Sequence, residues 1–404
     1  MDERVLTAGK QVLTALEKAG YTAYFVGGYV RDTILGREVH DLDVATSAHP
    51  EDVIRLFART VPTGMQHGTV TVLIDDVPIE VTTYRTESGY ADHRRPDSVA
   101  FVDQIEEDLA RRDFTVNAMA LGLRGEVIDP FGGQEDLQRG VIRAVGRPEE
   151  RFAEDALRML RCIRFASQLA FVIDESTFKA VCKQAETLRH VAVERIQTEW
   201  NKALAASGAS RAVQDVLTTG LAAHMPGIDE LLVTCSTDWK PVAITRLSGL
   251  AERWAYLFLS VEKTERVSAV LRALRCEKKL IQMCGSIVRI AQVLRTRPDQ
   301  REIGKLLVEN GLAVVERAAT VADVLNGQAV LVDEVRRQYE QMAIHTLTEL
   351  AVSGADLQRE LARRGGPWIR ETLMALAEEV NEGQRSNERA GLLIRAKEIV
   401  DVNT

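Results

Sequence analysis

The first 145 residues alternate between two hydrophobic patterns. Short apolar runs that alternate with polar residues, or that stop at glycine or aspartate, are typical of strands. Two segments, 11–19 and 30–35, repeat apolar residues at helical spacing and each ends at a glycine. The expected strands are 23–26, 41–45, 69–74, 79–84, 127–129 and 141–145. Because residues 75–78 separate two β-rich runs, we expect a hairpin there and an α+β fold with a small sheet.

After residue 148 the strand pattern fades and helical spacing dominates. The clearest helical stretches are 151–169, 193–206, 268–295 and 370–382. Glycine or proline marks joints at 207–208, 226–227, 297–298 and 365–367. The pattern predicts an all-α remainder after the α+β part.

Composition and cysteine spacing narrow the class of protein. The chain has 404 residues, of which 46% are hydrophobic and 27% are charged, an ordinary globular composition. No apolar run approaches the ~18 residues that a membrane span needs, and the N-terminus lacks the layout of a secretory signal, so we expect a cytoplasmic protein without membrane contact. The five cysteines show no C-x-x-C spacing, which argues against a disulfide framework and a zinc site.

The formal net charge of −8 is the wrong sign for bulk attraction to nucleic acid. A polyanion would therefore have to bind at a local basic patch. Residues 261–310 carry a net charge of +5 inside this acidic chain. That segment is either such a patch or a solvated helix surface.

Two neighbouring aspartates are the strongest chemical feature. In a strand, Asp41 and Asp43 point to the same face, where their like charges repel unless cations lie between them. Paired carboxylates suit Mg²⁺, and two such ions activate an attacking hydroxyl and hold a leaving phosphate. Glu80, in the predicted hairpin, is either a third acid beside the pair or an ordinary exposed strand residue.

A glycine pair precedes the aspartates. Gly27 and Gly28 follow a predicted strand and open a predicted helix, where glycines free backbone N–H groups to approach phosphate. Arg31 and Asp32 follow on the first turn of that helix. The alternative is a purely structural turn.

Five segments, in order, resemble the motifs of one family. They are 27–32 (GGYVRD) with 41–46 (DLDVAT), 111–118 (RRDFTVNA), 129–133 (DPFGG), 154–158 (EDALR) and Arg195 within VERI. They resemble the tRNA nucleotidyltransferase and poly(A) polymerase group, the class II branch of the polymerase-beta nucleotidyltransferase superfamily. The resemblance covers about the first 205 residues, and the helical remainder agrees with the body and tail domains of that family.

The resemblance implies a domain order and a metal site. It implies a catalytic nucleotidyltransferase head over 1–145, a helical neck over 146–206, a body over 207–296 and a tRNA-binding tail over 297–404. It implies that Asp41 and Asp43 hold two Mg²⁺ ions. One ion would lower the pKa of the attacking hydroxyl, and the other would neutralise the triphosphate.

The resemblance also implies a nucleotide-binding set. Arg112, Asp113 and Asn117 would contact the sugar and triphosphate, together with Gly28 and Arg31 of the first motif. Arg111 would assist with phosphate, although a surface basic pair is the commoner explanation for two adjacent arginines.

Asp155 and Arg158 are predicted to read the nucleobase. Both cytosine and adenine offer an amine donor beside a ring-nitrogen acceptor, and an aspartate and an arginine complement these two groups. Guanine and uracil present the donor and the acceptor in the reverse order, so polar groups would stay unpaired at a cost of about 1–3 kcal/mol each. One such pair would admit CTP and ATP without a template. Glu154 would orient Arg158, whereas the structural alternative is an i,i+3 salt bridge between Asp155 and Arg158 on one helix face. Arg161 and Arg164 continue the spacing and would reach the triphosphate, unless they form a solvated basic face.

Residues 90–99 form a polar segment that contains Arg94 and Arg95. It resembles the flexible loop of CCA-adding and A-adding enzymes, which CC-adding enzymes lack. The alternative is an ordinary solvated loop.

These features together predict a tRNA nucleotidyltransferase that adds C, C and A to the tRNA 3′ end from CTP and ATP and releases pyrophosphate. An A-adding enzyme or a poly(A) polymerase remains an alternative, and so does a non-catalytic RNA-binding protein of the same fold. Monomer and homodimer both remain open.

Overall fold

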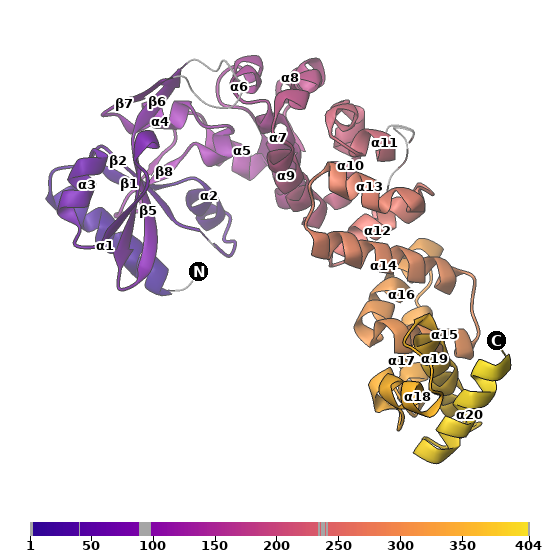
Figure 1. Cartoon of the computed structure of the whole chain (residues 1–404). Helices are drawn as coiled ribbons and strands as arrows, with labels where there is room; N and C mark the ends of the chain where they lie inside the picture. The colour runs from indigo at the N-terminus through magenta and orange to yellow at the C-terminus, as the bar shows by residue number, and fades with distance from the viewer. Residues whose placement is uncertain are drawn as a thin grey trace. The chain divides into compact units, whose positions relative to one another are not determined.

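The computed structural model describes residues 3–39, 41–88, 98–232, 235, 239 and 241–402. The chain divides into two compact units, Met1–Lys240 and Pro241–Thr404 (Figure 1). The first unit contains every described strand, and the second is built from helices. The predicted fold class, an α+β head followed by helical regions, is confirmed. The domain boundaries at 145, 206 and 296 stay predictions.

A seven-stranded sheet forms the centre of the first unit, in the order β3-β4-β5-β2-β1-β8-β9. Its strands are β1 (Ala23–Val26), β2 (Asp43–Thr46), β3 (Thr60–Gly64), β4 (Thr69–Ile74), β5 (Val77–Thr83), β8 (Ala120–Leu121) and β9 (Val127–Ile128). β2 and β5 run parallel, in a register that pairs Asp43 with Glu80. Two acids from distant sequence segments are therefore neighbours on adjacent strands. Two smaller sheets pair β6 (Arg85–Ser88) with β7 (Ser98–Phe101) and β10 (Val141–Ile142) with β11 (Val172–Ile173).

Three predicted strand boundaries were wrong in detail. The strand expected over 41–45 begins at Asp43, so Asp41 precedes it. The hairpin turn is two residues long, because Asp75 and Asp76 take φ of 47° and 64° and Val77 already pairs with Ile74. Positive φ at both central residues matches the twist of the flanking strands. The strand expected over 141–145 ends at Ile142.

Helices cover the sheet and continue the first unit (Figure 1). They are α1 (Glu3–Lys18), α2 (Gly28–Ile34), α3 (Pro50–Leu56), α4 (Ile105–Ala110), α5 (Gly133–Arg139), α6 (Pro148–Glu154), α7 (Leu157–Leu169), α8 (Glu175–Gln184), α9 (Val193–Ala205), α10 (Ala209–Thr218) and α11 (Ile228–Leu232). The predicted helix over 151–169 is interrupted at Asp155, whose backbone is extended (φ −141°, ψ 102°). Its side chain accepts a hydrogen bond from the Leu157 amide at 3.1 Å, which satisfies a free N–H at the start of α7.

The second unit consists of packed helices. They are α12 (Leu250–Ser260), α13 (Val267–Ala273), α14 (Lys278–Arg295), α15 (Gln300–Asn310), α16 (Leu312–Asn326), α17 (Leu331–Gln341), α18 (Gly354–Glu360), α19 (Pro367–Asn381) and α20 (Arg389–Val402). The predicted helix over 268–295 breaks after α13, where Arg275 takes a φ of 56°. Trp254 and Phe258 of α12 stack in the buried core with ring centroids 6.0 Å apart.

The sequence argues against disulfides and against membrane-spanning helices, and the structure can be compared with both expectations. Cys162, Cys276 and Cys284 are buried free thiols, whereas Cys182 is an exposed and Cys235 a partly exposed free thiol. In the described ranges, none of the helices is at once long and apolar enough to cross a membrane.

Candidate active site

A cavity of about 590 Å³ in the first unit gathers most of the predicted site residues. Those that line it are Gly28, Arg31, Asp41, Asp43, Arg112, Asp113, Asn117, Asp155, Arg158 and Arg161. Glu80, Glu154 and Arg164 lie outside its lining, and Arg94 and Arg95 lie outside the described residues. The cavity thus joins segments separated by more than one hundred positions in the sequence.

The glycine turn forms one wall of this cavity. Gly27 lies between β1 and α2 with φ 70° and ψ −135°, a conformation that L side chains rarely adopt. A Cβ at this position would lie 3.3 Å from Arg112 Nη1 and 3.8 Å from Asp43 Oδ2. The glycine therefore allows both the turn and the close approach of a guanidinium and a carboxylate.

The two aspartates reach the cavity from the start of β2. Asp41 and Asp43 are exposed while Leu42 between them is buried, so the predicted alternation is present although Asp41 precedes the strand. Desolvation is the largest cause that raises the pKa of Asp43, and the nearby Glu80 raises it further. Arg112 lowers this pKa, and Asp41 adds a smaller rise. The carboxylates of Asp41, Asp43 and Glu80 thus repel one another.

This donor set fits a hard divalent cation. Carboxylate oxygens are its preferred ligands, and a cation would relieve the repulsion that raises the Asp43 pKa. Over the ranges that the structure describes, no three His, Cys, Asp or Glu side chains gather into a metal-binding group. Glu80 therefore lies beside Asp43 along the sheet without completing a three-acid cluster.

A continuous polar network crosses the cavity floor. Arg31 donates to Asn117 Oδ1 at 2.8 Å and forms a bidentate pair with Asp32. Asn117 Nδ2 in turn donates to Asp113 at 3.2 Å. Arg161 donates to Asp113 Oδ2 from Nε and Nη2, at 2.8 and 2.6 Å. Arg31, Asn117, Asp113 and Arg161 are therefore already oriented by one another.

Asp113 is buried, with 8% of its surface exposed. Burial alone would raise its pKa, but the Arg161 guanidinium outweighs that effect, and the pKa falls to about 2. Asp113 is therefore a permanent anion that fixes Arg161.

Arg112 is the cation whose charge opposes the rise in the Asp43 pKa. Its Nη2 lies 3.2 Å from Asp108 Oδ2, and its Nε is buried without a hydrogen-bond partner among the described residues. A buried unpaired donor on a cavity wall is a natural contact for a polar ligand. Arg111 also donates to Asp108, and in addition to Glu87, so the interpretation of 111–112 as a surface basic pair was wrong.

Asp155 and Arg158 do not form the i,i+3 salt bridge that was the structural alternative. Asp155 accepts from Arg195 Nη2 at 2.7 Å and from Nη1 at 3.3 Å. Arg158 donates to Glu154 at 2.6 Å, so the expected orienting contact is present, although Asp155 lies off the helix. A different partner thus holds each member of the predicted base-reading pair.

Both members keep free hydrogen-bonding capacity. A carboxylate offers about four acceptor sites, and three contacts to Asp155 come from Arg195 and the Leu157 amide. Arg158 also donates to the backbone carbonyls of Arg151 and Arg111, at 3.2 and 3.0 Å. Three of its donors are engaged, which leaves two N–H groups for a ligand.

Arg164 lies outside the lining of this cavity. It is 8% exposed, pairs with Glu199, and donates to Gln168 at 2.7 Å. Its guanidinium lies over the Phe165 ring, 3.9 Å from the centroid. A solvated basic face for Arg161 and Arg164 was therefore wrong, since both are engaged in ion pairs.

Two contacts that hold site residues could not be predicted from the spacing of the motifs. Arg195 had been placed only by order along the chain, and its ion pair with Asp155 spans 40 positions. The Arg111 carbonyl supports Arg158 from 47 positions away, a contact that depends on backbone and not on residue type.

Similarity to known proteins agrees with this geometry. Residues 23–143 match the model of the poly A polymerase head domain, 170–232 that of the probable RNA and SrmB-binding site of polymerase A, and 246–396 that of a putative tRNA nucleotidyltransferase domain 2.

Whole-chain relatives extend this match. A protein of Limosilactobacillus reuteri described as a CCA-adding enzyme is 40% identical over 402 residues, which cover 98% of this chain and 97% of that protein. A CCA-adding enzyme of Geobacillus kaustophilus is 41% identical over 389 residues, 94% of this chain and 93% of the relative. The solved Bacillus stearothermophilus CCA-adding enzyme in complex with CTP superposes with a TM-score of 0.85 at 35% identity, covering 100% of both chains. The chain belongs to the CCA-adding enzymes of the tRNA nucleotidyltransferase and poly(A) polymerase family, and it is a nucleotidyltransferase.

Proposed function

We propose that this chain adds C, C and A to the 3′ end of tRNA, using CTP and ATP without a nucleic-acid template and releasing pyrophosphate. The observation that carries this is the near full-length similarity to CCA-adding enzymes. The cavity supports it, because Asp155 and Arg158 present one spare acceptor and two spare donors, the complement of cytosine and adenine.

Each wall of the cavity has a proposed task. The base would lie between Asp155 and Arg158, and the sugar and phosphates would pass Asp113, Asn117 and Arg112. Because these side chains are fixed by the network before a nucleotide binds, little side-chain ordering is needed on binding. The unpaired Arg112 Nε would gain its hydrogen-bond partner from the nucleotide.

Nucleotidyltransferases of this family use divalent metal, and Asp41 and Asp43 are the residues we assign to it. We propose Mg²⁺, with two ions. When bound, the metal supplies neutralisation of the triphosphate and a lower pKa for the attacking hydroxyl. The chain's own contribution is Arg112, whose guanidinium would hold the α-phosphate beside the Asp41 and Asp43 carboxylates and within reach of the tRNA 3′ hydroxyl.

The helical regions would grip tRNA. We propose a catalytic head (1–145), a neck (146–206), a body (207–296) and a tail (297–404), acting in the cytoplasm. Within the basic segment 261–310, several exposed cations make no ion pair among the described residues: Arg272, Lys278, Lys279, Arg289 and Lys305. Contacts there would be mainly to phosphate and would weaken as salt rises.

The test offers the purified protein one tRNA that lacks all three terminal nucleotides and one that ends in CC, followed by sequencing of the products. We expect CCA and A to be added, respectively. Extension of only the second tRNA would indicate an A-adding enzyme, and long tails would indicate a poly(A) polymerase.

Asp41→Ala tests the assignment of the metal site. We expect incorporation of labelled CTP and ATP to disappear while tRNA binding persists. Asp103→Ala is the matched control, since Asp103 is an exposed aspartate of the same unit outside the cavity. Incorporation by Asp41→Ala at the wild-type rate would show that the metal assignment is wrong.

A further inference from the structure

Arg151 lies behind the base-reading pair and belongs to none of the five motifs. It is a residue of α6, and it lies outside the lining of the nucleotide cavity, the cavity of about 590 Å³ that Asp155 and Arg158 line. A nucleotide in that cavity would therefore sense the Arg151 guanidinium only through another side chain.

Glu154 is the side chain that connects Arg151 to the base-reading pair. Arg151 Nη2 lies 2.5 Å from Glu154 Oε1, and Arg158 Nη1 donates to Glu154 Oε2 at 2.6 Å. Each oxygen of this one carboxylate thus binds a different guanidinium. The last torsion of a glutamate side chain has a broad range, so a carboxylate with one partner keeps rotational freedom. The contact from Arg151 removes that freedom and fixes the direction in which Oε2 meets Arg158.

Backbone carbonyls at the end of α4 hold both arginines. Arg151 Nη1 donates to the Ala110 carbonyl at 3.3 Å. Arg158 Nη2 donates to the next carbonyl along the chain, that of Arg111, at 3.0 Å. The last carbonyls of a helix lack partners within it, and the negative end of the helix dipole favours cations there. The two arginines thus dock on consecutive carbonyls of one helix end, with Glu154 bound to both.

The bridge through Glu154 is largely shielded from water. None of the side chains of Arg151, Glu154 and Arg158 is more than 20% exposed. A second i,i+3 ion pair, between Arg147 and Glu150 at 2.9 Å, lies at the same helix, but its arginine is 76% exposed. Exposed pairs of this kind contribute little, whereas shielded charges are screened less. Only the pair at Glu154 is therefore expected to restrain its members strongly.

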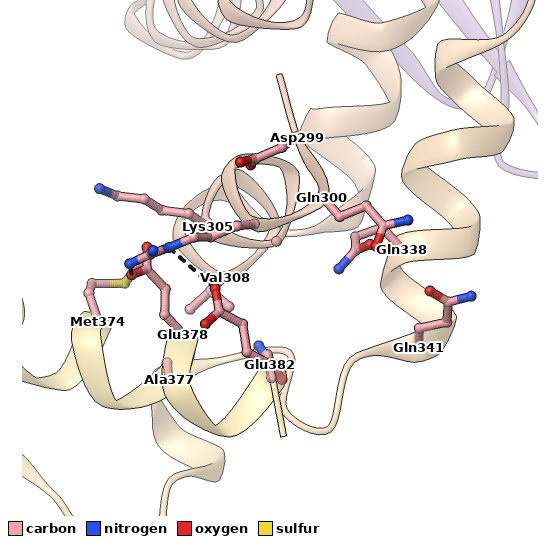
Figure 2. Close-up of a pocket in the computed structure, with 13 residues that line it drawn as sticks. Asp299, Gln300, Lys305, Val308, Gln338, Gln341, Met374, Ala377, Glu378 and Glu382 are labelled. Carbon is pink, nitrogen blue, oxygen red and sulfur yellow. Dashed lines mark hydrogen bonds and ion pairs between the residues drawn. The ribbon is translucent and has the colours of Figure 1, made fainter. Parts of the chain in front are cut away.

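The second unit contains the reverse arrangement, one arginine bound by two carboxylates (Figure 2). In a cavity of about 640 Å³ between α15, α17 and α19, Arg301 is held by Glu378 at 2.9 Å and Glu382 at 3.3 Å. The Arg301 side chain is mostly exposed, so water competes with both carboxylates. A bridge of three charged side chains fixes its members well only where little water reaches it, as around Glu154.

We propose that Arg151 is a positioning residue for base selection, which fixes Glu154 and, through it, the donors that Arg158 offers to the base. The inference rests on the proposed function, in which Asp155 and Arg158 read the base. Without Arg151, Glu154 would keep a single charged partner, and Arg158 would gain freedom to turn away from the N–H donor of uracil. A mismatched base would then cost less.

The experiment measures kcat/KM for single-nucleotide addition by the full-length protein with CTP and with UTP, and its readout is their ratio. We expect Arg151→Ala and Arg151→Met to lower this ratio about three- to tenfold, as for loss of one charge-assisted contact that acts through a second residue. The methionine keeps the apolar stem of the side chain and so keeps its packing. Arg151→Lys should stay within about twofold of the wild type, because its ammonium donors still reach Glu154.

Arg147→Ala is the matched control, since it removes the exposed ion pair beside α6 and should leave the ratio unchanged. A double-mutant cycle tests the route through Glu154. Glu154→Ala alone should lower the ratio, and Arg151→Met added to it should change the ratio by less than about twofold further, because the connecting carboxylate is already absent.

Two results would overturn the proposal. One is a wild-type ratio in both Arg151→Ala and Arg151→Met, including the case in which kcat/KM falls equally for both nucleotides, as for a merely structural role. The other is a double variant whose ratio falls by the full product of the two single effects. If the wild type itself added UMP as readily as CMP, the proposed reading of the base would be contradicted instead.

Discussion

Removing the Asp155 carboxylate should relax base selection. In the proposed complex, cytosine would direct its amine at this acceptor and its ring nitrogen at the Arg158 donors, whereas uracil would place an acceptor opposite Asp155 and a donor opposite Arg158. In Asp155→Ala the amine of cytosine loses its partner, and the oxygen of uracil no longer faces a carboxylate. CTP therefore loses a contact and UTP loses a repulsion.

The size of the effect follows from the burial of the site. An unpaired polar group in a closed site costs about 1–3 kcal/mol. At about 1.4 kcal/mol per factor of ten, the ratio of kcat/KM for CTP to that for UTP should fall about 5- to 150-fold. The remaining preference should come from Arg158, which Glu154 still holds at 2.6 Å.

The assay measures single-nucleotide addition to a tRNA that lacks its three terminal nucleotides, with CTP and UTP in separate reactions. Arg195→Ala is the companion variant, because it removes the ion pair of 2.7 Å but leaves the Asp155 carboxylate. It should lower kcat/KM for CTP while keeping more of the preference over UTP. If Asp155→Ala rejects UTP as strongly as the wild type does, the reading of the base by this side-chain pair is refuted.

Three further predictions concern stability. Asp113→Asn should lower the free energy of unfolding by about 2 kcal/mol at neutral pH, because the Arg161 ion pair holds the pKa of Asp113 in the folded protein at about 2 against an ordinary value of 3.8. This difference from the wild type should disappear as pH falls from about 4 to about 2. Urea titrations at a series of pH values measure it. Gly27→Ala should cost about 1–2 kcal/mol in the same assay, since its φ is 70°, and should reduce incorporation. Asp75→Asn combined with Asp76→Gly should raise the free energy of unfolding by about 0.5 kcal/mol, because both positions have positive φ; a lower melting temperature would contradict this turn assignment.

The spacing of hydrophobic residues predicted those parts of the fold that depend on interactions between residues close in sequence. The alternation around Leu42, the hairpin and the helical spacing after residue 148 all correspond to observed elements. Helical spacing alone predicts a helix over 151–169 that continues through Asp155, yet the helix is interrupted at Asp155 in the structure. Two partners explain the break: the Leu157 amide, which is local, and Arg195, which is 40 positions away. Spacing carries no information about the second.

The same limit applies to the charged side chains of the site. The sequence placed Arg161 and Arg164 on one helix at a three-residue spacing, and they are on one helix. Their surroundings differ: Arg161 is held by Asp113 at the cavity and also lies 3.6 Å from Glu199, whereas Arg164 pairs with Glu199 and lies outside the lining of the nucleotide cavity. Which acid an arginine meets is decided by tertiary packing, and so only the candidates, not the assignments, could be predicted.

The arrangement around Arg158 supports the proposal that this protein selects a base without a template. Its guanidinium is tied to Glu154 and to the carbonyls of Arg151 and Arg111, so its remaining donors point in fixed directions. Asp155 is fixed in the same way by an ion pair from another helix. Rigid donors and acceptors cannot turn to suit a mismatched base, and the mismatch therefore keeps its full cost. Under the proposed function, selectivity in this cavity would depend as much on the partners that immobilise Asp155 and Arg158 as on those two residues themselves.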